Sequence, residues 1–492
     1  MKIHPLMIVA MAMVMASVSN AQNDPVASQE DTAKTSTTRM SPELLWKLGR
    51  LGEAKTSSDG GRIVYSVRRY ELAEDKGTSS LHLINAKSNG NSKIIQDWAS
   101  ISSVQWAKTS DGERVFFIGM RGDDDEAETD KGDASEEEGD QVEEAPQAWS
   151  LNPDNGDTVQ LTNFEGGIAN LKVSPAGDHI AFTMDVKLDQ EVKDIYPDLP
   201  KADARIIDGL MYRHWNAWHD YKYSHLHVAP LKDGKVGEPI DLMKGAKADC
   251  PVPPFGGSEQ FTWSPDSKEI AFTLKDVPDW AQSTNSDVFV IEIGKEGAKP
   301  RNITEGMEGY DNNPVYSPDG KYLAFHSMER PSFESDRNRI MLLDRQSGKM
   351  RDLTTGLDQT AHEATWTPDS KNVLFSSEFR GTNQLFRASL ESTGVEQVSK
   401  GRHNWSLLEI FPDGETALVT KMDMLRPKEL AVINLTDATD RVISHVNDEI
   451  YATLELPKIE ERWVDATDGK KFIVGSFIRL DSTRRAKRNG QC

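Results

Sequence analysis

Residues 316–327 read YSPDGKYLAFHS, and this phrase decides the fold because it recurs along the chain. Proline presets the backbone angle at the second position of a tight turn, aspartate or serine hydrogen-bonds the turn, and glycine accepts its strained position. The alternating apolar and aromatic residues that follow are typical of a β-strand. Each copy therefore predicts a β-hairpin, and copies begin at residues 56, 108, 173, 263, 316, 366 and 410.

Most copies are followed by a second pair of strand-like segments, for example residues 286–304 and 337–354. Two hairpins make a four-stranded antiparallel unit, and the third residues of successive turns are 52, 65, 90, 53, 50 and 44 positions apart. Such a unit, repeated about every 40 to 50 residues, is typical of a β-propeller. We therefore expect an all-β propeller of seven blades, or eight if one is degenerate. A β-sandwich or a solenoid of unrelated hairpins would not explain the fixed order and spacing.

The N-terminus predicts export. Residues 1–21 carry Lys2 near their start, continue through an apolar run at 5–16 and end in small residues, as a secretory signal peptide does. A run of about 12 apolar residues is too short for the roughly 20 of a membrane-spanning helix. We expect a periplasmic or extracellular chain, with no membrane contact after cleavage, a flexible segment at 22–45 and the propeller at 46–455.

The two long spacings predict insertions, and the first is acidic. Residues 123–144 contain 13 acidic side chains and one lysine, so they supply −12 of the formal net charge of −22. A segment of this charge density cannot bury apolar surface, which predicts a disordered loop at a blade edge. Calcium binding is the alternative, but the D-x-[DN]-x-[DN]-G spacing of a calcium loop is absent from this segment.

The second insertion, residues 186–223, is rich in aromatic and ionisable side chains instead. Loops of this composition on a rigid scaffold often carry binding residues. The alternative is a helix that packs its aromatic side chains against the blade edge. A metal site is disfavoured because no carboxylate or cysteine follows the histidines at a telling spacing, and we expect neither metal nor cofactor. The histidines considered are His214, His219, His225 and His227.

Four longer phrases add to the repeats: LMYRHWNAW at 210–218, GGSEQFTWSPDSKEIAFT at 256–273, RPSFESDRNRIMLLDRQSG at 330–348 and ERWVDATDGKKFIVGSFI at 461–478. With them the sequence resembles the prolyl oligopeptidase family of serine peptidases, in particular its dipeptidyl peptidases and acylaminoacyl peptidase-like enzymes. The repeats alone are shared with TolB-like periplasmic propellers.

The resemblance implies that the propeller caps a C-terminal α/β-hydrolase domain and restricts substrates to short peptides. It also implies that propeller carboxylates hold the terminal ammonium of the substrate, as in dipeptidyl peptidases. The sequence departs from this pattern in two ways. A G-x-S-x-G nucleophile elbow is absent from the 492 residues, so we expect no catalytic residue in this chain and no activity of the chain alone. Asn216 and Ala217 stand where relatives often carry an acidic residue.

The candidate peptide contacts all lie in the second insertion. Two tryptophans offer stacking area, and an arginine could anchor a carboxylate of the substrate or of a neighbouring domain. Two aspartates remain as possible partners of an amine. The candidates are Arg213, His214, Trp215, Trp218, Asp208 and Asp220.

The last 14 residues, 479–492, are basic in an otherwise acidic protein. Clustered arginine and lysine often bind nucleic acid. However, the resemblance implies that the linker starting at 456–478 continues as PPGFDP…K…WP. Codons can be chosen for the tail that, read one base earlier, encode PPGFDPASKTQWPM. We therefore expect a frameshifted tail, no nucleic-acid function, and a chain truncated before the hydrolase domain.

Two functions remain open at this stage. The first is the substrate-gating propeller of an exported, dipeptidyl-peptidase-like serine peptidase whose catalytic domain is missing from the chain. The second is a non-catalytic, TolB-like periplasmic propeller that binds a protein or peptide.

Overall fold

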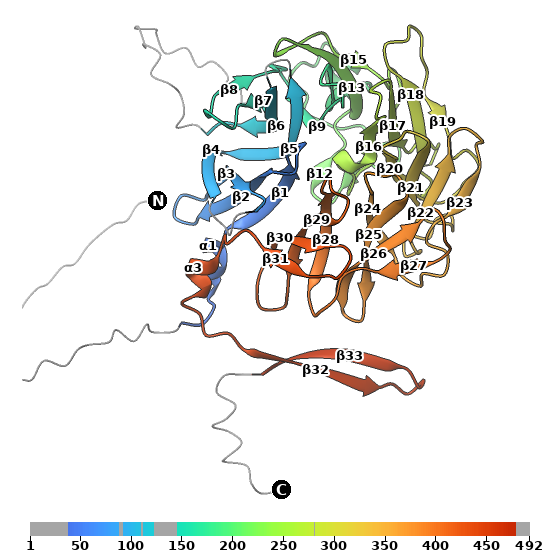
Figure 1. Cartoon of the computed structure of the whole chain (residues 1–492). Helices are drawn as coiled ribbons and strands as arrows, with labels where there is room; N and C mark the ends of the chain where they lie inside the picture. The colour runs from blue at the N-terminus through green and yellow to red at the C-terminus, as the bar shows by residue number, and fades with distance from the viewer. Residues whose placement is uncertain (1–37, 88–91, 110–111, 123–144, 280, 479–492) are drawn as a thin grey trace, which may run out of the picture.

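The computed structural model describes residues 38–87, 92–109, 112–122, 145–279 and 281–478, and these form a ring of seven antiparallel sheets (Figure 1). Each blade has four strands, except that two short strands share the outer edge of the third blade. The predicted propeller is confirmed with seven blades. The predicted acidic loop at 123–144 and the predicted tail at 479–492 lie outside the described residues.

The first four blades take up the chain as far as residue 302. Their strands are β1 (Arg50–Thr56), β2 (Arg62–Glu71), β3 (Lys76–Asn85) and β4 (Ser92–Trp98); β5 (Ser100–Thr109), β6 (Gly112–Met120), β7 (Gln147–Leu151) and β8 (Thr158–Gln160); β9 (Ala169–Val173), β10 (His179–Lys187), β13 (Lys222–Lys232), β14 (Lys235–Val236) and β15 (Ile240–Asp241); and β16 (Phe261–Trp263), β17 (Glu269–Leu274), β18 (Asp287–Glu292) and β19 (Arg301–Asn302).

The remaining three blades have the same order of strands. They are β20 (Asp311–Tyr316), β21 (Tyr322–Ser327), β22 (Arg339–Asp344) and β23 (Met350–Asp352); β24 (Ala361–Trp366), β25 (Asn372–Phe379), β26 (Thr382–Ser389) and β27 (Val395–Gln397); and β28 (Asn404–Ile410), β29 (Thr416–Met422), β30 (Glu429–Asn434) and β31 (Asp440–Val442).

The recurring turn phrase joins the first and second strands of a blade, as its chemistry predicts. In the fifth blade the Ser317 hydroxyl donates to Asp319 at 2.7 Å and accepts the backbone N–H of Tyr322 at 2.9 Å. Gly320 follows with φ +70°, in the left-handed region that glycine adopts without strain. The Ser264 turn of the fourth blade has the same contacts, because its hydroxyl donates to Asp266 at 2.7 Å.

The core consists of apolar layers between neighbouring blades. Between the fourth and fifth blades, for example, Ala271, Val288 and Val290 pack against Leu323 and Phe325. All five side chains are at most 6% exposed. Since each blade is covered by its two neighbours, most strands carry apolar residues on both faces.

The first strands of the blades are the innermost, and their side chains link one blade to the next. Glu53 accepts the backbone N–H of Val104 at 2.7 Å, and the Lys172 ammonium donates to the carbonyl of Phe261 at 2.7 Å. Burial lowers the pKa of Lys172 to about 8. These bonds run from the first blade to the second and from the third to the fourth.

Each blade is built from consecutive strands, so side chains rather than an exchanged strand close the ring between the seventh and first blades. The buried Asn447 amide donates to the carbonyl of Gly49 at 2.9 Å and accepts its N–H at 2.8 Å. Glu409 accepts the N–H of Thr56 at 2.6 Å, and its carboxylate lies 3.1 Å from the Lys55 ammonium. The closure therefore consists of these polar contacts, one apolar layer and a backbone bridge between Thr38 and Leu454.

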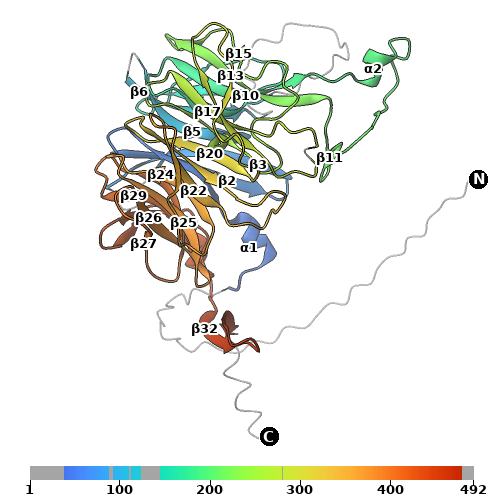
Figure 2. The ribbon, with the colours of Figure 1, turned by 90° about the vertical axis from the view of Figure 1, so that its right-hand side faces the viewer.

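The two faces of the ring differ. One carries the recurring turns, and the other carries the loops between the second and third strands of each blade; we call the latter the insertion face. Figure 2 shows α1 (Pro42–Lys47), α2 (Val192–Ile195) and β11 (Arg213–His214) on one side of the ring. Helix α1 begins within the segment predicted to be flexible, and Trp46 packs on Tyr70 at the end of β2 with ring centroids 5.4 Å apart.

After the seventh blade the chain forms α3 (Asp448–Tyr451) and then a two-stranded hairpin, β32 (Lys458–Asp465) and β33 (Lys471–Ile478). The hairpin contacts the insertion face, since Ile473 packs against Gly381 between β25 and β26, and Glu461 pairs with Arg402. None of the helices in the described ranges is long and apolar enough to cross a membrane.

Candidate functional site

The second insertion leaves the third blade after β10 and returns to it at β13. It contains α2 and a short hairpin of β11 and β12 (Ala217–Trp218), in which Arg213 pairs with Trp218 and His214 with Ala217. Figure 1, which looks along the ring, shows β12 near its centre, and Figure 2 shows β11 beside the face. The hairpin therefore lies over the middle of the ring, on the insertion face.

The base of the insertion is fixed to the third blade by a partly exposed polar group. The Tyr223 hydroxyl donates to Asp189 at 2.7 Å, and the Lys247 ammonium donates to the other carboxylate oxygen at 2.5 Å. The ring of His219 packs edge-on against Tyr223, with centroids 4.8 Å apart. These contacts hold the two ends of the insertion together, so its hairpin projects from a rigid base.

Trp215 is at the tip of the hairpin and is 68% exposed. Its ring meets His214 at 5.3 Å and Phe255 at 5.7 Å, both edge-on. Phe255 belongs to the loop that enters η2 (Ser258–Gln260) and is 80% exposed. Two large aromatic rings thus stand in solvent side by side on the insertion face, where they can stack on a ligand.

Trp218 is the second aromatic side chain of the hairpin and is 42% exposed. The Arg205 guanidinium lies 4.8 Å above its ring, and Arg213 lies 5.9 Å from it on the same hairpin. Arg205 also pairs with Asp220 at 2.9 Å, and this bond lowers the pKa of the Asp220 carboxyl. Asp220 is therefore already engaged by a cation, which leaves it less able to hold an amine.

Five of the six predicted contacts are brought together around this hairpin. Asp208 lies on the exposed segment before it and takes no part in these contacts. Asp208 is thus separate from the hairpin. The five are Arg213, His214, Trp215, Trp218 and Asp220.

Two of the four histidines considered as metal ligands, His225 and His227, lie on β13 and are buried within the third blade. His225 donates from its two ring nitrogens to Asp241 at 2.9 Å and to the carbonyl of Ala246 at 2.8 Å, and these bonds raise its pKa against the effect of burial. His227 lies two residues further along β13, on the same face of the strand, and its buried ring contacts the carbonyl of His225. Across the ranges that the structure describes, His, Cys, Asp and Glu side chains form no group of three placed to hold a metal.

A second polar cluster, in the fourth and fifth blades, was not found from the sequence. Its members carry buried side-chain oxygen or nitrogen atoms that have no hydrogen-bond partner in the described part of the chain. Native proteins rarely leave such groups unsatisfied, so they mark places where water, a ligand or a moving side chain is needed. The cluster consists of Thr273, Asp311, Asn313, His326, Asn338 and Arg339.

One comparison within the repeat could have revealed this cluster. Asp311 pairs with Ser327 at the start of β20, and Ala361 pairs with Ser377 at the same position of β24. A carboxylate at a position that holds alanine in the next blade indicates a buried charge. The insertion has its own unsatisfied buried atoms, on His214, His219 and Tyr221.

The β32–β33 hairpin exposes apolar side chains on both of its faces. Phe472, 60% exposed, pairs with Val464, and Phe477, 57% exposed, pairs with Ile459. Trp463 is 46% exposed. A two-stranded hairpin is marginally stable in water and needs a further covering surface.

The comparisons with known proteins agree with this architecture. Residues 262–452 match a family model described as the TolB beta propeller domain. The chain is 33% identical over 437 residues to dipeptidyl-peptidase 5 of Porphyromonas endodontalis, covering 88% of this chain and 59% of the relative. It is 31% identical over 464 residues to dipeptidyl-peptidase 5 of Porphyromonas gingivalis, covering 94% of this chain and 64% of the relative.

Solved structures show the same fold. The acylaminoacyl peptidase of Pyrococcus horikoshii superposes with a TM-score of 0.61 at 14% identity, over 88% of this chain and 58% of that one. The propeller domain of the Trilobed protease from Pyrococcus furiosus superposes with a TM-score of 0.52 at 12% identity, over 82% of this chain and 98% of that one.

The chain is therefore homologous to the propeller peptidases of the prolyl oligopeptidase type, which confirms the resemblance seen in its sequence. Among them, its curated relatives carry the name dipeptidyl-peptidase 5. The chain spans about three-fifths of the length of these relatives.

Proposed function

We propose that this chain supplies the substrate-gating propeller of an exported serine peptidase that cleaves short peptides in the manner of a dipeptidyl peptidase. The α/β-hydrolase domain with the catalytic serine, acid and histidine lies outside these 492 residues. The observation that carries the proposal is the match of 88% of this chain to 59% of a dipeptidyl-peptidase 5, in a sequence without a G-x-S-x-G elbow.

The geometry of the insertion face supports this assignment. The β11–β12 hairpin lies over the middle of the ring, and the β32–β33 hairpin, with exposed Phe472 and Phe477, lies at the edge of the ring and contacts an insertion-face loop at Gly381. A hydrolase domain that follows residue 478 and packs on this face would bury these apolar side chains and enclose the space below Trp215 and Phe255. A peptide would then reach the catalytic serine past the two rings.

The propeller contributes binding and exclusion rather than bond cleavage. Trp215 and Trp218 offer stacking surface, and Arg213 can receive a carboxylate of the peptide or of the neighbouring domain. The inner strands are bonded from blade to blade, as Val104 is to Glu53. If these bonds keep the ring closed, folded proteins are excluded, and short or unfolded peptides are the expected substrates.

Export is part of the proposal because residues 1–21 have the pattern of a secretory signal peptide. An acylaminoacyl peptidase that superposes with a TM-score of 0.62 has been solved with the peptide analogue Z-Gly-Gly-Phe-chloromethyl ketone. That protein binds a short apolar peptide, which supports the substrate class proposed for this chain.

A second candidate function is a non-catalytic, TolB-like periplasmic propeller that binds a protein or peptide. The match of residues 262–452 to the TolB beta propeller model supports it. The two functions differ in what covers the β32–β33 hairpin: a hydrolase domain in the first, and a separate partner in the second.

Peptide binding tests the role of the insertion. With fluorescein-labelled Gly-Ala-Phe-Ala-Lys as the probe, the Trp215→Ala, Trp218→Ala double variant is expected to bind at least fivefold more weakly than the parent chain. The reason is that each lost aromatic contact contributes about 0.5–1.5 kcal/mol. Fluorescence anisotropy measures the affinity.

The matched control is Trp46→Ala, which removes a tryptophan that is 44% exposed and packs on Tyr70 away from the hairpin. The control is expected to bind like the parent chain. Equal affinity of the parent and the double variant would exclude the hairpin from the binding site.

A further inference from the structure

The second polar cluster lies in the layer between the fourth and fifth blades, at its insertion-face edge. Asp311, Ser327 and Arg339 are register partners on three adjacent strands, so their side chains lie side by side on one face of the fifth blade. This face carries Leu323 and Phe325 further along, and those side chains pack on the fourth blade. The three polar side chains therefore lie in the same interface between the fourth and fifth blades as the apolar side chains.

Asp311 is fully buried, and neither of its carboxylate oxygens has a hydrogen-bond partner among the described residues. Its backbone is fixed, because its N–H donates to the carbonyl of Ser286 at 3.0 Å and its carbonyl accepts the Ser286 hydroxyl at 2.9 Å. The nearby hydroxyls of Ser327 and Thr304 contact the carbonyl of Met328 at 3.5 Å and Asp287 at 2.8 Å, and both also act on the Asp311 carboxyl by lowering its pKa.

Several charged groups surround this carboxyl. Asp287 approaches from β18, Arg339 from β22, and Arg339 in turn contacts Glu329. Lys275 after β17 faces Glu334 of the loop above, and His326 lies on the opposite face of β21. Burial, together with Asp287, raises the pKa of Asp311 to about 7, although Arg339 acts in the other direction.

Because the pKa of Asp311 is raised in the folded chain, the stability of the fold depends on pH. The ordinary value for the unfolded chain is 3.8, so folding favours the protonated carboxyl. The stability due to the neutral acid is fully present below about pH 4 and is lost as the pH rises through 7. Above that pH the buried carboxylate requires a donor.

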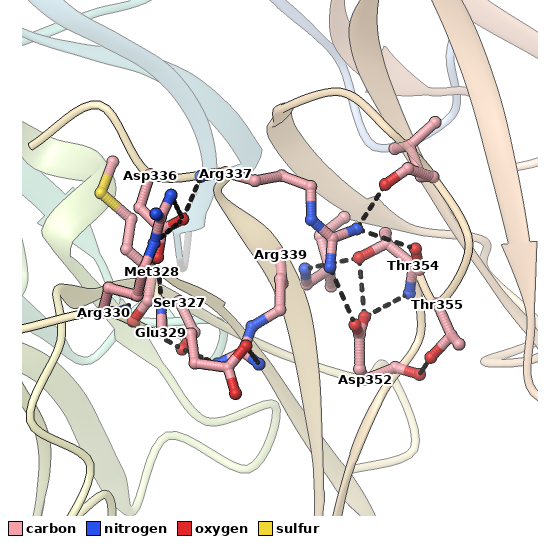
Figure 3. A network of polar contacts seen from close by, with 12 residues as sticks. Ser327, Met328, Glu329, Arg330, Asp336, Arg337, Arg339, Asp352, Thr354 and Thr355 are labelled. Atoms are coloured by element: carbon pink, nitrogen blue, oxygen red, sulfur yellow. Dashed lines mark hydrogen bonds and ion pairs between the residues drawn. The ribbon is translucent and has the colours of Figure 1, made fainter. Parts of the chain in front are cut away.

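One hydrogen-bond donor of Arg339, its Nε–H group, has no partner among the described residues. Its Nη1 lies 3.0 Å from Glu329, and its Nη2 donates to the Ser327 hydroxyl at 3.2 Å (Figure 3). Its Nε is buried without a partner. The Arg339 side chain is 14% exposed whereas that of Glu329 is 73% exposed, so the arginine reaches from the interior toward the surface.

We propose that Arg339 is a two-position switch that pairs outward with Glu329 while Asp311 is neutral and inward with Asp311 once that carboxyl has ionised. The inward position satisfies the buried carboxylate and the free Nε together. It also releases Glu329, which then stands as an unpaired carboxylate on the insertion face.

The effect on the loop between β21 and β22 is local. Arg330 and Asp336 close this loop through two bonds of 3.0 and 2.7 Å that do not involve Arg339 (Figure 3). The Met328 N–H donates to the carbonyl of Tyr310 at 3.0 Å and the Glu329 N–H donates to Asp336 at 3.1 Å, so the Arg339 pair adds one further contact, through the Glu329 side chain. We therefore expect the pH-dependent loosening at the start of the loop. The switch does not depend on the proposed peptidase function.

Amide hydrogen exchange of the purified chain tests the switch. After correction for the intrinsic pH dependence of exchange, peptides that cover residues 327–330 are expected to exchange at least fivefold faster at pH 8 than at pH 5. The Asp311→Asn variant keeps the shape of the side chain but cannot ionise, so its corrected exchange should be slow at both values.

Glu329→Gln is the matched second variant, and it changes a side chain that is 73% exposed. Because it removes the carboxylate charge that holds Arg339 outward, its corrected exchange should be fast at both pH values. A parent chain without a pH effect, an Asp311→Asn variant that retains it, or a Glu329→Gln variant that stays slow at pH 5 would each overturn the switch. The Glu329→Gln result decides the matter even if Asp311→Asn fails to fold.

Discussion

Replacing Trp405 with alanine is expected to lower the free energy of unfolding by about 3–5 kcal/mol, the usual cost of removing a buried aromatic side chain. Trp405 on β28 is 1% exposed and packs in the layer between the sixth and seventh blades, against Leu374 and Val419. Its indole N–H donates to the carbonyl of Lys400 at 3.4 Å. The substitution leaves a large cavity and an unpaired carbonyl, and urea unfolding followed by circular dichroism measures the loss.

Trp46→Ala serves as the control for this substitution too, because it removes the same side chain from an exposed helix. Its cost should be about 1 kcal/mol or less. Equal costs for the two variants would mean that the layers between blades do not carry the stability of the ring.

Asn447→Ala is the second substitution with a large expected effect, a loss of about 2–4 kcal/mol. It leaves the buried N–H and carbonyl of Gly49 without partners, and each such group costs about 1–3 kcal/mol. Because these two bonds connect the seventh blade to the strand that starts the first, the loss should concentrate at the closure. Native-state hydrogen exchange should show faster exchange in β1 and β31 than in β17.

Asn155→Ala is the control for the closure. Asn155 accepts the N–H of Asp157 at 3.0 Å in an exposed turn of the second blade, so its removal should cost only a few tenths of a kcal/mol. Exchange that increases evenly around the ring in Asn447→Ala would contradict a closure that depends on this amide.

The fold could be predicted because its determinants are local in the sequence. The Ser264, Ser317 and Thr367 turns each contain a hydroxyl and an aspartate two residues apart, and in each the hydroxyl donates to that aspartate at 2.6–2.7 Å. The strand that follows each turn has its own alternating pattern of apolar residues. A unit repeated seven times can thus be recognised without knowledge of how the blades pack.

The site could be predicted only in part. The composition of residues 186–223 located the insertion, but the β11–β12 hairpin and the pairing of Arg205 with Asp220 depend on contacts that sequence spacing does not determine. The Asp311 cluster was missed because YDNNP reads as a polar turn. Asp311 is buried because of its strand register with Ser327 and Arg339 and because the fourth blade packs over it. Neither the register nor this packing can be predicted from the residues next to Asp311 in the sequence.

We infer that the catalytic groups of the peptidase lie outside this chain. Peptide hydrolysis of this kind needs an activated serine, a general base and an oxyanion hole held together, and the propeller contains no such set in its sequence motifs. The measurement is the hydrolysis of dipeptidyl and acylated p-nitroanilides by purified residues 22–492, with and without a serine-directed fluorophosphonate. Dipeptidyl-peptidase 5 of Porphyromonas gingivalis is the positive control.

The expected result is no product above background and no fluorophosphonate label on the chain, while the control enzyme shows both. Release of product that the fluorophosphonate abolishes, together with a label on a serine of residues 22–492, would contradict the account.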